Sequence, residues 1–262
     1  MKNKVVYTNI FDSPADIIVN PVNTKGVTGK GLALEYSKRY PSANVKYKAA
    51  CKSKTLKIGT LQLVRDGGKS ILLFPTKEEW RYNSKMEYIR AGLNKIVEAR
   101  DRFEGKVISF PKLGSGAGRL DWDKVKSLII EILKPLDIEI LFHEPKVFTS
   151  YFARVKHVEE KGITPVSISR VTPKWLPDIK RDINLAPSSN LLFKYKEGNM
   201  SEEDYEKIYR KETLSKLDQH NVFSAHAGEC VMCYEKSVDF CHRQIFARWM
   251  GEAGFEVEEI KF

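Results

Sequence analysis

Short apolar and β-branched runs alternate with helical spacing through the first half of the chain. The runs predict buried strands at residues 5–10, 17–23, 61–64, 70–74, 106–110 and 138–142. Apolar residues three and four positions apart predict helices that open near residue 32 and that cover residues 84–100 and 121–133. Strands that alternate with helices indicate an α/β fold, and the most apolar strands are typical of a parallel sheet.

The second half of the chain continues the α/β pattern after a short junction at residues 143–146. Its apolar runs predict strands at residues 147–152, 164–170, 230–235 and 255–260. Ser201 is followed by acidic residues, which predicts a capped helix that runs to about residue 217. A further helix is expected to open at residues 241–243. We therefore expect a first domain at residues 1–145 and a second, smaller α/β domain at residues 146–262.

Composition and charge narrow the function. The chain has 262 residues and a net charge of +10, which favours a polyanionic partner such as nucleic acid or a phosphorylated ligand. It has no apolar run long enough to span a membrane, and a strand-like stretch at the N-terminus leaves no room for a signal peptide. Of its four cysteines, three lie within residues 230–241, which is unlike a secreted disulfide framework. We therefore expect a cytoplasmic protein with no membrane partner.

Polar and glycine-rich stretches follow the ends of several predicted strands. Lys77 comes directly after the apolar run at residues 71–74, and ligands of open α/β sheets bind at the carboxyl ends of the strands. Glycine loops at residues 26–31 and 114–118 each stand between a strand and a helix, where backbone amides can cradle phosphate. Two such loops and a lysine suit a ligand with a diphosphate and a sugar on each side. The alternatives are ordinary turns and a solvated lysine.

Together these motifs resemble a macrodomain, and more narrowly the branch that contains the DarG antitoxins and the eukaryotic terminal ADP-ribose glycohydrolase. The resemblance covers residues 1–144 and rests on the runs 19–23, 29–31, 74–77, 80–81 and 113–122. It implies a three-layer α/β/α fold with a mixed sheet. It also implies ADP-ribose as ligand or product, with no cofactor required.

The resemblance assigns roles to individual residues. Lys77 matches the lysine on which catalysis depends in this branch, and Asn9 and Ile10 match the adenine-side turn. The other positions that match ADP-ribose contacts are Asn20, Asn23, Gly29, Lys30, Gly31, Leu32, Thr76, Gly114, Ser115, Gly116, Ala117 and Gly118. Gly118 stands where the eukaryotic relative has a catalytic aspartate, so the bacterial DarG pattern fits better. The neighbouring Asp121 is expected to cap a helix instead.

The function that this resemblance implies is hydrolysis of the bond between ADP-ribose and a nucleobase in DNA. Neutral Lys77 would attack the anomeric carbon of the distal ribose, whereas charged Lys77 would donate a proton to the leaving base. The implied partners are ADP-ribosylated DNA and a cognate ADP-ribosyltransferase toxin. The alternatives are a hydrolase for ADP-ribosylated protein or a free ADP-ribose derivative, a module that binds ADP-ribose without cleaving it, and a partner that neutralises a toxin by direct contact.

The cysteines of the second half permit three interpretations. Cys230, Cys233, Cys241 and His242 offer four zinc ligands, but positions three apart in a strand point to opposite faces, so we expect no metal. Alternatively, Cys241 at a helix N-terminus has a lowered pKa, and Cys241, His242 and Arg243 bind phosphate or act as a nucleophile with its acid–base partner. In the third interpretation Cys230 and Cys233 belong to the core, and His242 and Arg243 hold a loop.

The second half also resembles a family known only as domain of unknown function 488. The matching runs are residues 151–154, 165–170, 191–192, 195–196, 233–236 and 239–243. The resemblance implies a compact α/β domain with a site at Tyr151, Arg154, Arg170, Glu235, Cys241, His242 and Arg243. It implies no established reaction. We expect this domain to bind or process the nucleic acid or a nucleotide product.

Overall fold

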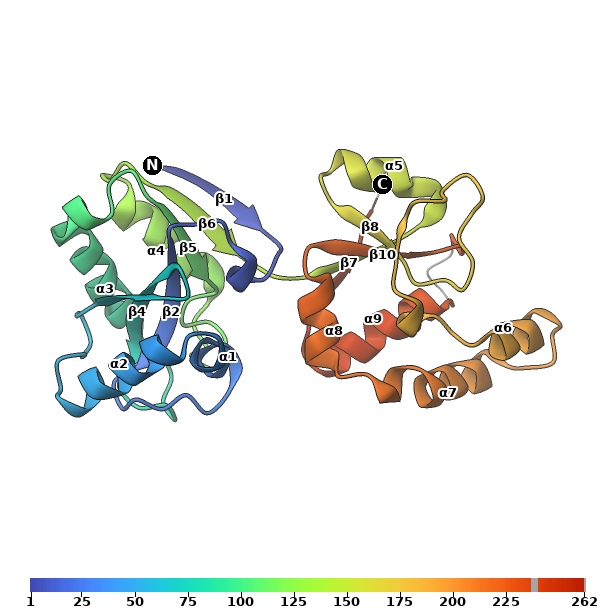
Figure 1. Cartoon of the computed structure of the whole chain (residues 1–262), viewed down its shortest axis with the longest axis horizontal. Helices are drawn as coiled ribbons and strands as arrows, with labels where there is room; N and C mark the ends of the chain where they lie inside the picture. The colour runs from blue at the N-terminus through green and yellow to red at the C-terminus, as the bar shows by residue number, and fades with distance from the viewer. Residues whose placement is uncertain (237–239, 262) are drawn as a thin grey trace. The chain divides into compact units, whose positions relative to one another are not determined.

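The computed structural model describes residues 1–236 and 240–261, so Asp239 of the second family resemblance lies outside the described residues. The chain forms two compact units (Figure 1). The first consists of residues 1–6 and 10–144, and the second of residues 7–9 and 145–262. No helix in the described part of the chain is long and apolar enough to cross a membrane.

The first unit is built on a six-stranded mixed sheet. Its strands, in spatial order, are β1 (Lys2–Val6), β6 (Glu139–His143), β5 (Val107–Pro111), β2 (Ile17–Asn23), β4 (Lys69–Lys77) and β3 (Gln62–Asp66). All neighbouring pairs are parallel except β3 with β4, which form an antiparallel hairpin. Glycines with positive φ at residues 67 and 68 close that hairpin. The carboxyl ends of β2, β4 and β5 therefore share one edge of the sheet.

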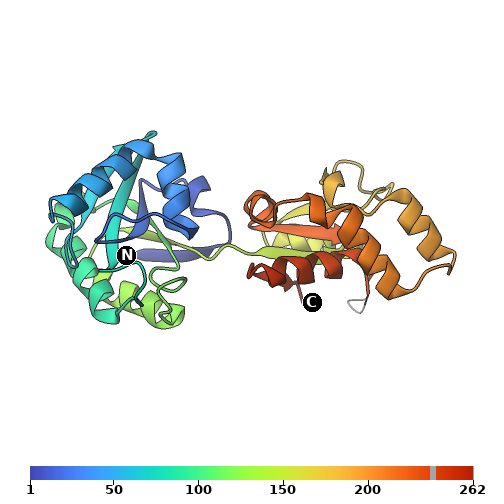
Figure 2. The same cartoon turned by 90° about the horizontal axis from the view of Figure 1, so that it is seen from below.

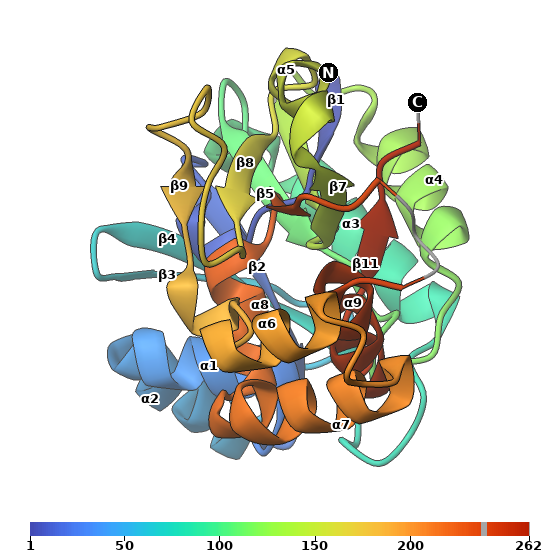
Figure 3. The same cartoon turned by 90° about the vertical axis from the view of Figure 1, so that its right-hand side faces the viewer.

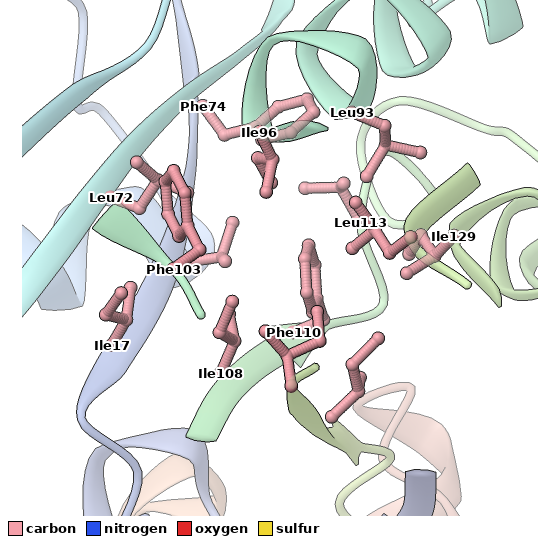
Figure 4. Packing of buried hydrophobic residues seen from close by; sticks show 14 of the residues in the cluster. Ile17, Leu72, Phe74, Leu93, Ile96, Phe103, Ile108, Phe110, Leu113 and Ile129 are labelled. Carbon is pink, nitrogen blue, oxygen red and sulfur yellow. The ribbon is translucent and has the colours of Figure 1, made fainter. Parts of the chain in front are cut away.

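Helices cover both faces of this sheet, as Figure 2 shows, so the predicted three-layer fold is confirmed. α1 (Gly31–Arg39) and α2 (Pro41–Lys52) pack on one face, where Tyr36 and Tyr47 join the apolar core. α3 (Met86–Glu98) and α4 (Trp122–Leu133) pack on the other face. The core beneath them brings together Phe74, Phe110 and the helix residues Leu93, Ile96 and Ile129 (Figure 4).

The sequence pattern misplaced some elements of the first unit. The strand predicted at residues 5–10 is instead β1, and Ile10–Asp12 forms the 3-10 helix η1. Helix α2 was not predicted because its sequence is rich in alanine and lysine and has only a weak apolar stripe. Asp121 caps α4 as predicted, since its carboxylate accepts a hydrogen bond from the Lys124 amide at 3.2 Å.

The second unit has a five-stranded parallel sheet. Its strands, in spatial order, are β11 (Val257–Glu259), β7 (Val147–Tyr151), β10 (Glu229–Cys233), β8 (Thr164–Ser167) and β9 (Lys180–Arg181). One face packs against α5 (Val155–Glu160). The other carries α7 (Glu202–Glu212) and α9 (His242–Glu252), and α6 (Ser189–Lys196) lies on the same side (Figure 3).

The helix expected from Ser201 to residue 217 is shorter in the structure. Ser201 caps it, accepting a hydrogen bond from the Asp204 amide at 3.1 Å. The helix ends at Glu212, after which come the 3-10 helix η5 (Leu214–Lys216) and α8 (Gln219–His226). Asp218 caps α8 through the Asn221 amide at 2.8 Å, and the sequence pattern did not predict this second helix.

Candidate functional site

Lys77 is the last residue of β4, at the carboxyl end of the strand. Only 9% of the residue is exposed, and Nζ donates a hydrogen bond to the carbonyl oxygen of Ala117 at 2.5 Å. Burial lowers the pKa of the Lys77 ammonium below the ordinary lysine value, and the charges of Lys30 and Arg119 lower it further. The shift enlarges the fraction of neutral amine, which is the nucleophilic form of lysine.

Lys77 contacts the second glycine-rich loop and the residue that leads into the first. Thr24 begins the loop after β2, and its amide donates to the Lys77 carbonyl oxygen at 3.0 Å. Ala117, in the loop after β5, accepts the hydrogen bond from the Lys77 ammonium. Asn23 lies opposite Lys77 in the pairing of β2 with β4. The structure therefore brings together at one sheet edge three motifs that are far apart in the sequence.

Asn23 shapes the first loop from within. Its amide nitrogen donates to the Val27 carbonyl at 2.7 Å, and its oxygen accepts from the amides of Lys25 and Val27 at 3.0 and 3.2 Å. The loop ends at Gly31, where φ is +61° and where α1 begins without a side-chain cap. The amides at this helix start are thus left to another partner, as an anion would provide.

Gly118 is sterically required in the second loop. Its carbonyl accepts from the Ser84 amide at 2.9 Å. A Cβ atom at residue 118 would overlap the Gly114 carbonyl oxygen and the Ser84 hydroxyl, whereas a Cβ at Gly116 would meet nothing within 4 Å. An aspartate at residue 118, as in the eukaryotic relative, does not fit this loop conformation.

The other residues that the resemblance matches to ADP-ribose contacts differ in burial and in their hydrogen-bond partners. Asn20 is buried and lines a cavity of about 10 Å³ with Asn44, large enough for one water molecule. The hydroxyl of Thr76 donates to the Val22 carbonyl at 3.5 Å. Ile10 is buried in the first unit, whereas Asn9 groups with the second. The contacts predicted between ADP-ribose and these residues stay predictions.

Sequence reasoning missed two residues that bear on this site, Arg119 and Ser84. Arg119 has a φ of +60°, an uncommon backbone conformation for a residue other than glycine, and its charge acts on Lys77. Ser84 ties the loop after β4 to Gly118 through its backbone. Arg119 lies in the matched run 113–122 but received no role there, and Ser84 belongs to no motif; the fold brings the charge of Arg119 to Lys77 and ties Ser84 to the loop that contacts it.

In the second unit, Arg243 is completely buried. Its guanidinium donates to both carboxylate oxygens of Glu259 at 3.2 Å. Nη1 also donates to the Cys233 sulfur and to the Glu235 carbonyl oxygen, each at 2.9 Å. These four bonds make Arg243 an internal tie between β10, α9 and β11, which is closer to the loop-holding role of the third interpretation than to an open phosphate-binding group.

Cys241 stands directly before α9, and its thiol has unusual surroundings. The Cys233 thiol donates a hydrogen bond to it, and this bond, with the charge of Arg243, lowers the pKa of Cys241 to about 7. His242 is buried, which lowers its pKa to about 4, and its Nε2 has no hydrogen-bond partner among the described residues. A partly ionised thiol thus lies next in sequence to a neutral imidazole.

Two of the candidate zinc ligands lie on opposite faces of β10. Cys230 packs in the core on the α5 side of β10, whereas Cys233 faces Arg243 on the other side. One ligand atom each from Cys233, Glu235 and His242 does lie within 4.8 Å of the others. However, the Arg243 guanidinium at 2.9 Å from the Cys233 sulfur opposes a second cation there.

The remaining predicted residues of this unit lie near β10 or farther away. Tyr151 pairs with Cys233 across β7 and β10, and its hydroxyl accepts from the Nε of Arg154 at 3.0 Å. Arg170 instead donates to the carbonyl oxygens of Ala186 and Pro187. Its guanidinium therefore supports a loop.

The second unit also holds a charged cluster that the sequence did not indicate. Buried His226 lies 3.0 Å from Asp182 and 2.9 Å from Glu229, and these carboxylates raise its pKa against the opposing effect of burial. Lys180 pairs with Glu229 at 2.6 Å. No local spacing signals this cluster, because Asp182 and His226 are 44 residues apart.

A mixed sheet between two helical layers, with a lysine and two glycine-rich loops at one carboxyl edge, defines an α/β/α domain for a nucleotide-like ligand. Residues 19–129 match the Macro domain family, and residues 155–254 match the Active DUF488-N3 subclade. Through its first unit, the chain belongs to the macrodomain family.

The relatives agree with this assignment. A DNA ADP-ribosyl glycohydrolase of Thermus aquaticus is 37% identical over 177 residues, which cover 65% of this chain and 46% of that protein. The macrodomain of Mycobacterium tuberculosis DarG has 32% identity and a TM-score of 0.51, over 55% of this chain and 99% of that one. Thermosipho africanus DarTG in complex with ADP-ribose has 30% identity and a TM-score of 0.50, over 55% of this chain and 42% of that one. The chain thus spans about half the length of the curated relatives that it matches.

Proposed function

We propose that this chain is an ADP-ribosyl glycohydrolase that removes ADP-ribose from nucleobases in DNA. The observation that carries the proposal is Lys77, a buried lysine of lowered pKa at the carboxyl edge of the sheet, which contacts Ala117 in the second glycine-rich loop and Thr24 just before the first. Relatives named DNA ADP-ribosyl glycohydrolase, at 35–37% identity, support DNA as the carrier of the modification. The net charge of +10 suits such a polyanion.

The lowered pKa of Lys77 supports the neutral, nucleophilic route. The amine attacks the anomeric carbon of the distal ribose, and the bond to the nucleobase breaks as the base leaves with a proton from the lysine nitrogen. The ribose ring then opens, which gives an imine between Lys77 and the sugar. Water then hydrolyses the lysine–ribose adduct, which regenerates the amine and releases ADP-ribose. The rival route, in which charged Lys77 protonates the leaving base, forms no adduct.

Release of ADP-ribose from modified oligonucleotides tests the proposal. Wild type should release it from oligonucleotides modified on thymine or on guanine, and Lys77→Ala should be slower by at least about 100-fold while still binding ADP-ribose in calorimetry. The control Lys95→Ala changes an exposed lysine of α3 and should behave as wild type. Cyanoborohydride should trap an adduct on Lys77 if the nucleophilic route is followed. Full activity of Lys77→Ala would refute the proposal.

Two alternatives are separated by the same experiment. If wild type binds ADP-ribose but releases none from either base, the chain is a binding module or acts on another carrier. ADP-ribosylated protein and free ADP-ribose derivatives are the substrates to compare.

We also propose that the chain reverses the action of a cognate DNA ADP-ribosyltransferase. One relative, from Thermosipho africanus, is named as a fusion of a DNA ADP-ribosyl transferase with a DNA ADP-ribosyl glycohydrolase. The four cysteines carry free thiols, which suits the cytoplasmic setting that we propose for this activity.

For the second unit, we propose a separate thiol-based site centred on Cys241. Its support is the hydrogen bond from Cys233, the nearby Arg243 and the Nε2 of buried His242, which has no hydrogen-bond partner in the part of the chain that the structure describes. We propose that this site binds or processes the nucleic acid or a nucleotide product. Both hydrogen bonds from Arg243 to the Glu259 carboxylate are internal, and the side chain is buried. Exposed cations such as Arg154 are therefore better suited to contact phosphate.

A further inference from the structure

The first unit has a hollow at the edge of its sheet opposite to Lys77. The hollow has a volume of about 620 Å³ and lies at the amino ends of β2, β4 and β5. Its lining residues come from the stretch before β2, the β3–β4 hairpin, the 3-10 helix η2 (Arg100–Arg102) and the residue before β5. Lys69, which lines the hollow, and Lys77 are the two ends of β4, so about 26 Å separates them along the strand. We call this feature the amino-edge hollow.

Hydrogen bonds to the stretch that precedes β2 hold the walls of the amino-edge hollow. The Lys69 ammonium donates to the carbonyl oxygens of Ser13 and Ala15, at 2.7 and 3.4 Å, which ties the hairpin to this stretch. The Asp16 carboxylate accepts from the Val107 amide at 2.9 Å, which ties the same stretch to β5. These contacts join residues that are at least 54 positions apart in the sequence. The amino-edge hollow is therefore formed by the folded sheet and not by one loop.

Positive charge is concentrated in the amino-edge hollow. Its described lining residues include four cations, Arg65, Lys69, Arg102 and Lys106, and one carboxylate, that of Asp16. In the part of the chain that the structure describes, none of these four cations forms an ion pair, and the Lys69 ammonium is bonded to uncharged carbonyl groups. Arg65, Arg102 and Lys106 are exposed. Cations that converge without counter-charges repel one another, so a ligand with several negative charges stabilises the arrangement.

Two carboxylates near the amino-edge hollow are engaged elsewhere. Asp66, next to Arg65 on the hairpin, accepts a hydrogen bond from the Ala43 amide of α2 at 2.8 Å. Glu104, which follows η2, pairs with Arg100 at 2.8 Å. Neither carboxylate lines the hollow, so the charge of its four cations stays available to a ligand.

We propose that the amino-edge hollow binds backbone phosphates of DNA, at a distance from the nucleotide that Lys77 acts on. Exposed Arg and Lys side chains without partners bind a backbone strongly because each phosphate they neutralise releases its counterions. None of the described lining residues is aromatic, so nothing there stacks on a base, and the lining suits the phosphates of a strand better than a free nucleotide. The distance of about 26 Å from Lys77 corresponds to about eight nucleotides of a DNA strand. The choice of DNA rests on the proposed function.

Binding of unmodified DNA to the full chain tests the inference without any hydrolysis. The triple variant Arg65→Gln, Arg102→Gln, Lys106→Gln removes the exposed cations and keeps Lys69 and Asp16, which hold the walls. Its affinity for a labelled oligonucleotide of about 24 nucleotides should fall about 10-fold or more at low salt. The slope of log K against log salt concentration should become shallower by about 2–3, because three phosphate contacts are lost. ADP-ribose affinity, measured by calorimetry, should stay as in wild type.

A second triple variant controls for net charge. Arg90→Gln, Lys95→Gln, Lys124→Gln removes the same charge from exposed positions on α3 and α4. Its salt slope and its affinity for the oligonucleotide should stay close to those of wild type. An equal loss in the two triple variants, or no loss in the first, would overturn the amino-edge hollow as a DNA site.

Ligand length distinguishes a DNA strand from a free nucleotide as the source of the phosphates. Wild type should bind the long oligonucleotide far more tightly than it binds dTTP. If dTTP bound as tightly, and lost its affinity in the first triple variant, the amino-edge hollow would be a nucleotide site and the proposed DNA contact would be wrong.

Modified substrates keep this inference apart from the proposed function. With a single ADP-ribosylated base, the first triple variant should raise KM for a strand of about 24 nucleotides and leave KM unchanged for one of about four, which is too short to reach the hollow. An equal rise for both lengths would contradict a distant contact. If wild type released no ADP-ribose from either strand, the hydrolase proposal would fail, and the binding of unmodified DNA would still decide whether the amino-edge hollow contacts it.

Discussion

At the scale of single residues, the chemistry of this protein depends on surroundings that the residue type does not reveal. The chain is rich in lysine, yet Lys77 is buried beside two other cations and has a lowered pKa. Arg243 has the residue type of a phosphate ligand, yet all of its described partners are internal. Gly118 resembles any loop glycine, yet it alone fits between Gly114 and Ser84.

The pair Gly118 and Gly116 gives a matched test of the second loop. Gly118→Ala should weaken ADP-ribose binding and destabilise the protein by about 1–3 kcal/mol, because the new Cβ forces the Gly114 and Ser84 segments apart. Gly116→Ala should change stability far less, since its Cβ meets nothing within 4 Å. Calorimetric titration with ADP-ribose and urea unfolding measure both effects. Equal behaviour of the two variants would contradict the steric argument.

At the scale of elements, both units place chemistry where a strand ends and a helix or loop begins. In the first unit, β2, β4 and β5 deliver Asn23, Lys77 and the second loop to one sheet edge. In the second unit, β10 ends at Cys233 and α9 begins after Cys241. The thiols of these two residues, which come from separate elements, form a hydrogen bond. Parallel strands make this possible because their carboxyl ends share one edge.

The contact between β10 and α9 predicts the pH dependence of the Cys241 thiol. Its pKa of about 7 means that alkylation by iodoacetamide should rise with pH through a midpoint near 7. Cys233→Ala removes the hydrogen-bond donor to the thiolate, so the pKa and the midpoint should move upward. Cys230→Ala, on the opposite face of the same strand, should leave the midpoint in place. Peptide mass spectrometry follows each cysteine, and an unchanged midpoint in Cys233→Ala would exclude this role of Cys233.

At the scale of the whole molecule, the chain consists of two units that each have a sheet and a core of their own. The first unit closes its sheet with β1 against β6, so it needs no strand from the second. Its glycine-rich loops and Lys77 also come from one unit. We therefore propose that residues 1–145 form an independent domain.

A truncated protein of residues 1–145 tests that independence. It should fold cooperatively, bind ADP-ribose with nearly the affinity of the full chain, and release ADP-ribose from a modified nucleoside at a similar rate. Circular dichroism, calorimetry and the release assay measure these properties. An unfolded truncation would show that the second unit is needed for stability. A folded truncation that fails only on oligonucleotides would assign part of the DNA recognition to the second unit.

The sequence by itself determined the fold class, most strands and the first set of chemical residues, because apolar periodicity, glycine loops and the residues that follow strand ends are local signals. It also indicated Lys77, the two loops and the group around Cys241. Only the tertiary structure decided which of these residues meet, since Ala117 and Arg119 reach Lys77, and Ser84 reaches Gly118, through chain folding that no local pattern encodes. It likewise turned Arg243 inward to Glu259 and left Trp80 and Tyr82 exposed, because burial and charge pairing depend on distant neighbours.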